Sequence, residues 1–357
     1  MARRWNSGIT SLEFNQDQGC FTCCLKTGLR VYNVEPLVEK AHYSKEELGE
    51  VSLCEMVFRT NWLLLVRARR PCSLMLLDDQ KRAFRAEIMF KSPIRALRAR
   101  RDKVAVALSS SIQVLTLPSF TRVALVRTRP DARALVALAS EPTAPHLLAA
   151  PAHRKGSLQL LDVTRSLRGA HSTSPVVMGC HQTELVCVSL SANGARLATA
   201  SERGTLIRLW DTATKTMLHE LRRGADYADV FCIRFNRSGS LVSCVSDKGT
   251  LHVWRADAAR AVSAAGGGGG GGAGVGAGFA RSARRALAAR RGGHLAAARA
   301  APDLIMHALC AFIDDNTAIV ICKDGTFHKF TFAHEGNYHR SDYQYFLQVG
   351  EDDEFWH

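Results

Sequence analysis

The stretch LVCVSLSANGARLATASERGTLIRLWDTATKTMLHEL, Leu185 to Leu221, contains an apolar run, a polar turn with Gly194, a second run that ends in Ser201, a Gly-Thr turn and a third run. Apolar and polar residues alternate inside these runs, as they do in strands whose two faces have different surroundings. Short runs separated by glycine turns are typical of antiparallel sheets. The stretch therefore predicts consecutive antiparallel strands.

A second copy, VFCIRFNRSGSLVSCVSDKGTLHVWRA, Val230 to Ala256, repeats the same order of strands and turns. The third run of each copy ends in tryptophan, and Trp210 and Trp254 are spaced as in the roughly 40 to 45 residue repeat of WD propeller blades. Weaker copies begin at Ile9, Leu53, Ile94, Leu135 and His307. Because one blade cannot bury its own faces, we predict an all-β fold, a single seven-bladed β-propeller of the WD-repeat type over residues 1–357.

One segment, 258–302, interrupts this pattern with seven consecutive glycines, many alanines, seven arginines and no acidic residue. Such a composition buries too little apolar surface to fold alone, so we expect a flexible basic loop between the third and fourth strands of blade 6. Its stretch FARSARRALAARR could form a basic amphipathic helix that contacts a membrane, or could be an inert linker. The candidate membrane-contact residues are Phe279, Arg281, Arg284, Arg285 and Leu287. Residues 333–357 are expected to form a C-terminal tail that is acidic at its end.

The charge balance favours an anionic partner. The chain has 47 Lys and Arg residues against 33 Asp and Glu residues, a net charge of +14. Phospholipid headgroups and nucleic acids are the usual partners of such a surface, although a GC-rich genome also produces many arginines. Aromatic residues make up only 7% of the chain, which argues against base stacking on nucleic acid.

The sequence contains none of the catalytic motifs that we searched for, so we expect no enzyme activity and no cofactor. Eleven cysteines, an odd number, lie mostly in apolar strand-like runs and are expected to be reduced thiols. Cys20 and Cys23 have CxxC spacing without a second ligand pair, so no metal site is expected. No apolar run reaches the eighteen residues of a membrane span.

The double arginine in MLHELRRGAD, Arg222 and Arg223, lies between the two strongest copies. Neighbouring strand residues point to opposite faces, so this pair could serve two adjacent phosphate pockets. Hydroxyl and basic side chains occur around it in both copies: Ser201, Thr205, Arg208, Ser246, Lys248, Thr250 and His252. A basic residue at the position of Arg208 also occurs in other copies, where it is ordinary propeller surface. His181 could equally be the structural histidine of a WD repeat.

The sequence resembles the PROPPINs, seven-bladed propellers that bind phosphoinositides. The resemblance rests on TSLEFNQDQGCFTC, GLRVYNVEPLVEK, GSLQLLDV, GTLIRLWDT, ELRRG, SDKGTLHVW and DGTFHKFTF. The L-R-R-G form is similar to one branch of the family, where most members have F-R-R-G. The resemblance implies two sites for phosphatidylinositol 3-phosphate and phosphatidylinositol 3,5-bisphosphate. The first would use His181, Ser201, Thr205, Arg208 and Arg222, and the second Arg223, Ser246, Lys248, Thr250 and His252.

The resemblance also implies a role as a peripheral scaffold in autophagosome formation. The protein would be cytoplasmic, associate with preautophagosomal or endosomal membranes and recruit the rod-shaped autophagy lipid-transfer protein through Asn15 and Asp17. The blade 6 loop is usually the membrane-inserting element of this family, and here it has few large apolar residues. We expect a monomer that binds no nucleic acid. The alternative is a generic WD-repeat scaffold that uses its basic surface for proteins or nucleic acid.

Overall fold

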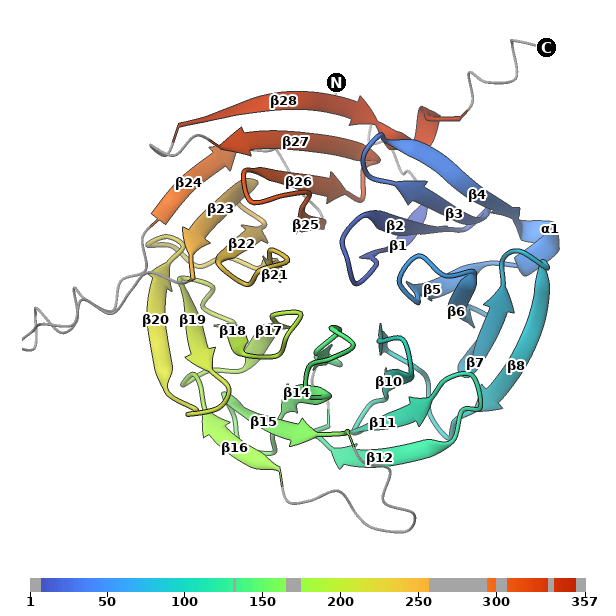
Figure 1. Ribbon diagram of the computed structural model, residues 1–357, viewed down its shortest axis with the longest axis horizontal. Helices are drawn as coiled ribbons and strands as arrows, with labels where there is room; N and C mark the ends of the chain where they lie inside the picture. The colour runs from blue at the N-terminus through green and yellow to red at the C-terminus, as the bar shows by residue number, and fades with distance from the viewer. Residues whose placement is uncertain are drawn as a thin grey trace, which may run out of the picture.

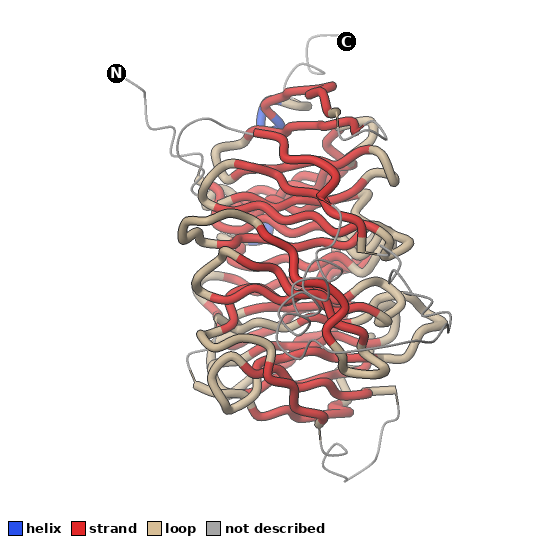
Figure 2. Tube along the Cα trace, turned by 90° about the vertical axis from the view of Figure 1, so that its left-hand side faces the viewer, coloured by secondary structure: helices blue, strands red, loops and turns tan. Residues whose placement is uncertain are grey.

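The predicted seven-bladed propeller is confirmed by the computed structural model, which forms a ring of seven four-stranded antiparallel sheets (Figure 1). The structure describes residues 8–130, 133–164, 175–256, 294–299, 307–332 and 337–350. Figure 2 shows the ring edge-on as a thick disc of stacked strands. Each blade consists of four strands that follow one another in the chain, so the local repeats of the sequence correspond directly to blades.

The strands of blades 1 to 4 have the following bounds: β1 (Ile9–Phe14), β2 (Cys20–Leu25), β3 (Gly28–Asn33), β4 (Val38–Ser44), β5 (Val51–Met56), β6 (Trp62–Arg67), β7 (Arg70–Asp78), β8 (Ala83–Met89), β9 (Ala96–Ala99), β10 (Lys103–Ala107), β11 (Ser111–Thr116), β12 (Arg122–Arg127), β13 (Ala137–Leu138), β14 (Leu147–Pro151), β15 (Ser157–Asp162) and β16 (Val176–Gly179). A short helix, α1 (Lys45–Leu48), connects the first two blades and is capped by the hydroxyl of Ser44.

Blades 5 to 7 are made of these strands: β17 (Leu185–Leu190), β18 (Arg196–Ser201), β19 (Leu206–Asp211), β20 (Met217–Arg222), β21 (Val230–Phe235), β22 (Leu241–Ser246), β23 (Thr250–Arg255), β24 (His294–Arg299), β25 (Ala308–Phe312), β26 (Thr317–Cys322), β27 (Thr326–Phe332) and β28 (Tyr338–Tyr345). A 3-10 turn, η1 (Phe346–Gln348), follows the last strand.

The apolar core lies between neighbouring blades. One cluster joins the inner strands of blades 2 and 3, and another joins blades 5 and 6. The second strand of a blade is the most buried, and every residue of β2, β22 and β26 is buried. Burial between blades explains why no single repeat could form this core alone.

The ring closes where blade 1 meets blades 6 and 7. The side chain of Gln18 donates from Nε2 to the carbonyl oxygen of Phe235 at 2.9 Å and accepts from the backbone N–H of Phe312 at 2.9 Å. The ring of Phe346 packs edge-on against Phe21 and Tyr32. One amide and one aromatic cluster therefore connect the two ends of the propeller.

The structure corrects two predicted boundaries. Residues 294–299, expected in the flexible loop, form β24 and pair with β23 as the fourth strand of blade 6. Residues 338–345, expected in the C-terminal tail, form β28 and pair with β27. Outer strands need little apolar character, because their exposed face contacts solvent, so neither segment showed a strand pattern. The rest of the predicted loop, with all five candidate membrane-contact residues, lies outside the described residues.

Candidate functional site

Ser201, Thr205 and Arg222 belong to the same end of blade 5. Ser201 ends β18, Thr205 lies in the turn to β19, and Arg222 ends β20, where it pairs with Leu206. The backbone N–H groups of Arg223 and Gly224 donate to the carbonyl oxygen of Thr205 at 2.9 and 3.4 Å. Arg222 is exposed, and no described residue makes a hydrogen bond or ion pair with its guanidinium. Its five N–H donors are therefore available to a phosphate at this end of the blade.

Arg223 points the other way, into the protein, and is only 7% exposed. Its Nε donates to the carbonyl oxygen of Gly204 at 2.6 Å, and its Nη2 donates to the carbonyl oxygen of Asp226. The two arginines do face opposite sides, as the strand periodicity predicts. The guanidinium of Arg223, expected to bind phosphate in the second site, instead ties the β18–β19 turn to the connection between blades 5 and 6.

His181 belongs to the internal hydrogen-bond network of blade 5. Its Nε2 lies 3.0 Å from Oγ1 of the buried Thr199, which also accepts a 3.0 Å hydrogen bond from Nε1 of Trp210. Burial, and then the charge of Arg208, lowers the pKa of His181 to about 4. His181 is thus neutral near pH 7 and occupies the structural position that the sequence left open.

Arg208 lies beside His181 and already has anionic and carbonyl partners. Its Nε and Nη2 each lie 3.0 Å from Oε2 of Glu220, and its Nη1 donates to the carbonyl oxygen of Cys180 at 2.6 Å. A phosphate could engage Arg208 only by competing with Glu220. The structure therefore divides the first predicted set: Arg222 is exposed and Thr205 partly exposed, Ser201 is buried, and His181 and Arg208 are bonded internally.

The corresponding end of blade 6 holds the second predicted set. Ser246 is buried at the end of β22, Thr250 begins β23, and between them Lys248 is exposed with its Nζ 3.1 Å from Oδ2 of Asp247. His252 stacks on Trp254, with ring centroids 5.4 Å apart. These residues lie at the same end of their blade as Ser201 and Thr205 do in blade 5. To bind a phosphate, the ammonium group of Lys248 would have to leave the carboxylate of Asp247.

The candidate partner residues differ in access. Asn15 is buried, and its side chain accepts from the N–H of Cys20 at 3.0 Å and donates to the carbonyl oxygen of Phe58 at 3.2 Å. Asp17 is partly exposed and pairs with Arg59 at 2.9 Å. Asn15 therefore shapes the turn, and only Asp17 presents a functional group at the surface.

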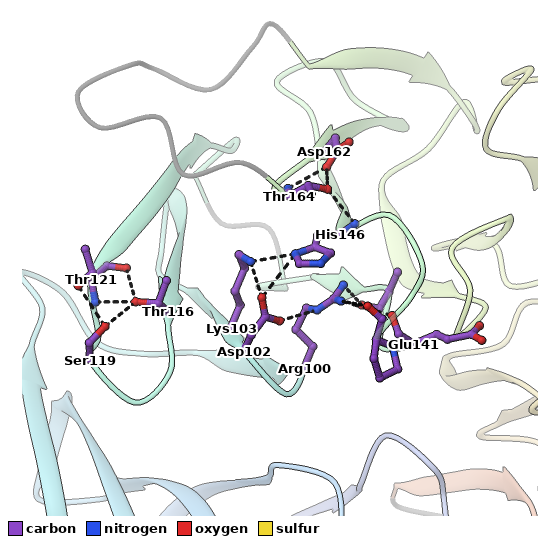
Figure 3. Close-up of polar contacts among 12 residues, drawn as sticks. Arg100, Asp102, Lys103, Thr116, Ser119, Thr121, Glu141, His146, Asp162 and Thr164 are labelled. Carbon is purple, nitrogen blue, oxygen red and sulfur yellow. Dashed lines mark hydrogen bonds and ion pairs between the residues drawn. The ribbon is translucent and has the colours of Figure 1, made fainter.

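A second polar cluster, between blades 3 and 4, was not predicted. Figure 3 shows Arg100, Asp102, Lys103 and His146 converging there. Arg100 donates from Nε to Asp102 at 2.8 Å and from its other nitrogens to the carbonyl oxygens of residues 139, 141 and 142. Lys103 contacts both Asp102 and His146, at 2.5 and 2.9 Å. These contacts use the cationic groups to join two blades, so we assign the cluster a structural role.

Sequence reasoning missed two exposed residues beside the blade 5 end, Arg203 and Tyr227. Arg203 lies in the turn between Ser201 and Thr205, and Tyr227 lies in the connection that follows the double arginine. The turn position of Arg203 was visible in the sequence. The exposure of Tyr227 could not be predicted from the sequence, because an aromatic residue near a strand is usually part of a core.

Other classes of site find no support in the described part of the chain. It contains no group of three or more His, Cys, Asp and Glu side chains able to hold a metal ion. The described residues also include no helix with the length and apolarity needed to cross a bilayer. All eleven cysteines are free thiols, and ten of them are buried.

Known proteins share both the sequence pattern and the fold. A PROPPIN family model matches residues 8–265. SVP1-like protein 2 of Pichia angusta is 33% identical over 262 residues, which cover 72% of each chain. Autophagy-related protein 18 of Yarrowia lipolytica is 28% identical over 273 residues, 71% of this chain and 68% of that protein. Hsv2 of Kluyveromyces lactis superposes with a TM-score of 0.75 at 20% identity, covering 95% and 99% of the two chains. This chain belongs to the PROPPIN family.

Proposed function

We propose that this protein binds phosphatidylinositol 3-phosphate and phosphatidylinositol 3,5-bisphosphate on membranes and acts as a non-enzymatic scaffold in autophagosome formation. Membership of a family of phosphoinositide-binding propellers and the likeness to autophagy-related protein 18 support this class of function. The observation that carries the proposal is the exposed Arg222, with unused donors, at the blade end where the partly exposed Thr205 lies in the β18–β19 turn. A planar guanidinium beside hydroxyl groups matches the oxygens of a phosphate monoester.

The two proposed sites differ in the internal contacts that must break before a phosphate can bind. At the blade 5 site, Arg222 can bind a phosphate without losing a described contact. At the blade 6 site, Lys248 must leave Asp247, and Arg223 must give up carbonyl partners before it could bind a ligand. We therefore propose that the blade 5 site binds the headgroup more tightly, and that Arg223 contributes by tying the β18–β19 turn to the connection between β20 and β21.

For the protein partner, we propose the rod-shaped autophagy lipid-transfer protein, bound at the blade 1 turn through Asp17. The ion pair with Arg59 leaves Asp17 partly exposed, and Gly19 donates its backbone N–H to the other carboxylate oxygen at 3.0 Å. A basic group of the partner could share this carboxylate. Binding of the purified partner to Asp17→Asn protein, which should be weaker than to wild type, tests this contact.

Flotation with vesicles tests lipid binding. Wild-type protein is expected to float with vesicles that contain phosphatidylinositol 3-phosphate, and not with vesicles of equal charge made with phosphatidylserine, at about 0.15 M salt, where nonspecific attraction is screened. Arg222→Thr should abolish this specific flotation without changing the stability of the protein. The single variant is preferable to the Arg222→Thr/Arg223→Thr double variant, because removal of Arg223 also removes internal contacts.

Equal flotation of wild type and Arg222→Thr on both kinds of vesicle would contradict specific headgroup binding. It would favour the alternative, a scaffold that uses its general basic charge. Arg122→Thr offers a matched control, since Arg122 is also an exposed arginine and begins β12 in blade 3, away from both proposed sites. This control should float as wild type does.

A further inference from the structure

The connection between β20 and β21 presents an exposed aromatic side chain. Tyr227 is 68% exposed, one of the largest values among the large hydrophobic and aromatic residues of the described chain. Its two neighbours behave differently: Ala228 is buried, and the carbonyl oxygen of Asp226 accepts from the buried guanidinium of Arg223. The chain thus holds the backbone on both sides of Tyr227 while it leaves the ring in solvent.

The backbone that carries Tyr227 is fixed to the turns of both blades. The N–H of Ala228 donates to the carbonyl oxygen of Arg203, in the β18–β19 turn, at 3.3 Å. The N–H of Asp229 donates to Oδ1 of Asp247, in the β22–β23 turn, at 3.0 Å. Tyr227 therefore lies between the two proposed headgroup sites.

The turn at Gly204 packs closely against the connection that carries Tyr227. Gly204 has a φ of +62°, and a Cβ built on it would lie 1.9 Å from the carbonyl oxygen of Ala228. Only glycine allows so close an approach of the turn to the connection. Holding an aromatic ring in water by such specific contacts has no evident benefit for stability, which points to a role in binding.

We propose that Tyr227 is a membrane anchor that inserts into the headgroup region of a phosphoinositide-containing bilayer. This inference rests on the proposed function, because headgroups bound on either side would bring the bilayer against this connection. Tyrosine suits the position, since its ring is apolar and its hydroxyl can remain at the level of the headgroups. This contact of Tyr227 with the bilayer does not require the predicted blade 6 loop.

Simple attraction to anionic lipid does not account for this anchor. Asp226 and Asp229 are exposed and flank Tyr227, and Glu202 is exposed in the β18–β19 turn. These carboxylates are repelled by an anionic surface, and the ring itself carries no charge. A loss of vesicle binding in Tyr227→Ala would therefore report the burial of the ring in the bilayer.

The test compares binding of a soluble headgroup with binding of vesicles. Titration calorimetry with inositol 1,3-bisphosphate should give the same affinity for wild type and Tyr227→Ala, because the ring is not part of either pocket. Affinity for vesicles with phosphatidylinositol 3-phosphate should fall roughly tenfold in Tyr227→Ala. This is the effect expected from losing the burial of about half of an aromatic ring. Tyr227→Trp should retain wild-type vesicle affinity.

Met89→Ala is the matched control. Met89 is also 68% exposed, at the end of β8, which lies across the ring from β20 (Figure 1). Unchanged vesicle affinity in Tyr227→Ala, with intact headgroup binding, would overturn the anchor and leave the proposed function standing. Failure of wild type to bind both the soluble headgroup and the vesicles would overturn the proposed function and the anchor together. An equal loss in Met89→Ala would also contradict the anchor.

Discussion

The guanidinium of Arg223 donates from Nε to the carbonyl oxygen of Gly204 at 2.6 Å, and so joins the double-arginine segment to the turn of blade 5. We expect Arg223→Thr to lower the free energy of unfolding by about 1 to 3 kcal/mol, because buried carbonyl groups lose charged donors. Arg222→Thr, at an exposed position, should change it by less than about 0.5 kcal/mol. Urea denaturation of the two single variants measures the difference. Equal stability of both variants would show that the internal contacts of Arg223 contribute nothing.

Thr199 supports a second testable contact, since its hydroxyl joins Trp210 and His181. Thr199→Val keeps the shape of the side chain but removes the hydrogen-bond partner of the indole N–H and the closer partner of the imidazole, which also lies 3.3 Å from the carbonyl oxygen of Thr199. We expect a loss of about 2 to 3 kcal/mol, the cost of leaving buried polar groups unsatisfied. Thermal and urea unfolding would measure it.

Thr22→Val is the control for this effect. Thr22 is also buried, but its hydroxyl donates only to carbonyl oxygens, those of Glu13 at 3.3 Å and Cys54 at 3.0 Å. A carbonyl tolerates the loss of one partner better than an indole N–H does. The stability loss should be clearly smaller than for Thr199→Val. A loss of the same size would contradict the assignment of His181 and Trp210 to one network.

An ion-pair cluster that joins blades 1, 3 and 6 provides a third prediction. Glu13 of blade 1 pairs with Arg98 of blade 3 at 2.9 Å and with Arg234 of blade 6 at 2.5 Å. Glu13→Gln leaves two partly buried cations without their shared carboxylate, so we expect a loss of about 1 to 3 kcal/mol, between the values for exposed and for buried ion pairs. In Glu13→Gln/Arg98→Met the loss should be less than the sum of the two single variants, because one repelling cation is gone. Strictly additive losses in denaturation experiments would show that the pair is not coupled.

The strand pattern predicted the seven blades because the inner strands alternate or are wholly apolar. It failed for β24, HLAAAR, whose three alanines favour no particular strand face, and for β28, YHRSDYQY, whose residues are mostly exposed. An outer strand is held mainly by backbone hydrogen bonds to its neighbour, so its own side chains need not follow a strand pattern. Fourth strands are therefore the elements of a blade that sequence periodicity detects least.

The candidate site shows a related limit. Periodicity correctly placed Arg222 and Arg223 on opposite faces, yet the partners of Arg223 come from the backbone of a turn and a connection. Backbone carbonyls exist at every residue, so no side-chain pattern indicates which of them an arginine will reach. The internal contacts of Asn15 were not predicted for the same reason, since its partners at residues 20 and 58 are backbone groups.

The pKa of His181 predicts how stability depends on pH. Burial and Arg208 hold this pKa at about 4 in the folded protein, below the value of about 6.5 in an unfolded chain. Above about pH 6.5 both states are neutral at this residue, and stability does not depend on it. As pH falls from about 6.5 to about 4, only the unfolded state takes up the proton, so stability decreases by about 1.4 kcal/mol per pH unit.

Urea denaturation between about pH 7 and about pH 5 should therefore show a shallower loss of stability for His181→Gln than for wild type. Part of the slope should remain, because burial also lowers the pKa of His328 to about 4. Headgroup binding should not change with the titration of His181 in this range, since its imidazole stays neutral in the folded protein. Identical pH slopes for His181→Gln and wild type would contradict the buried, neutral state of His181 and reopen its assignment to the headgroup site.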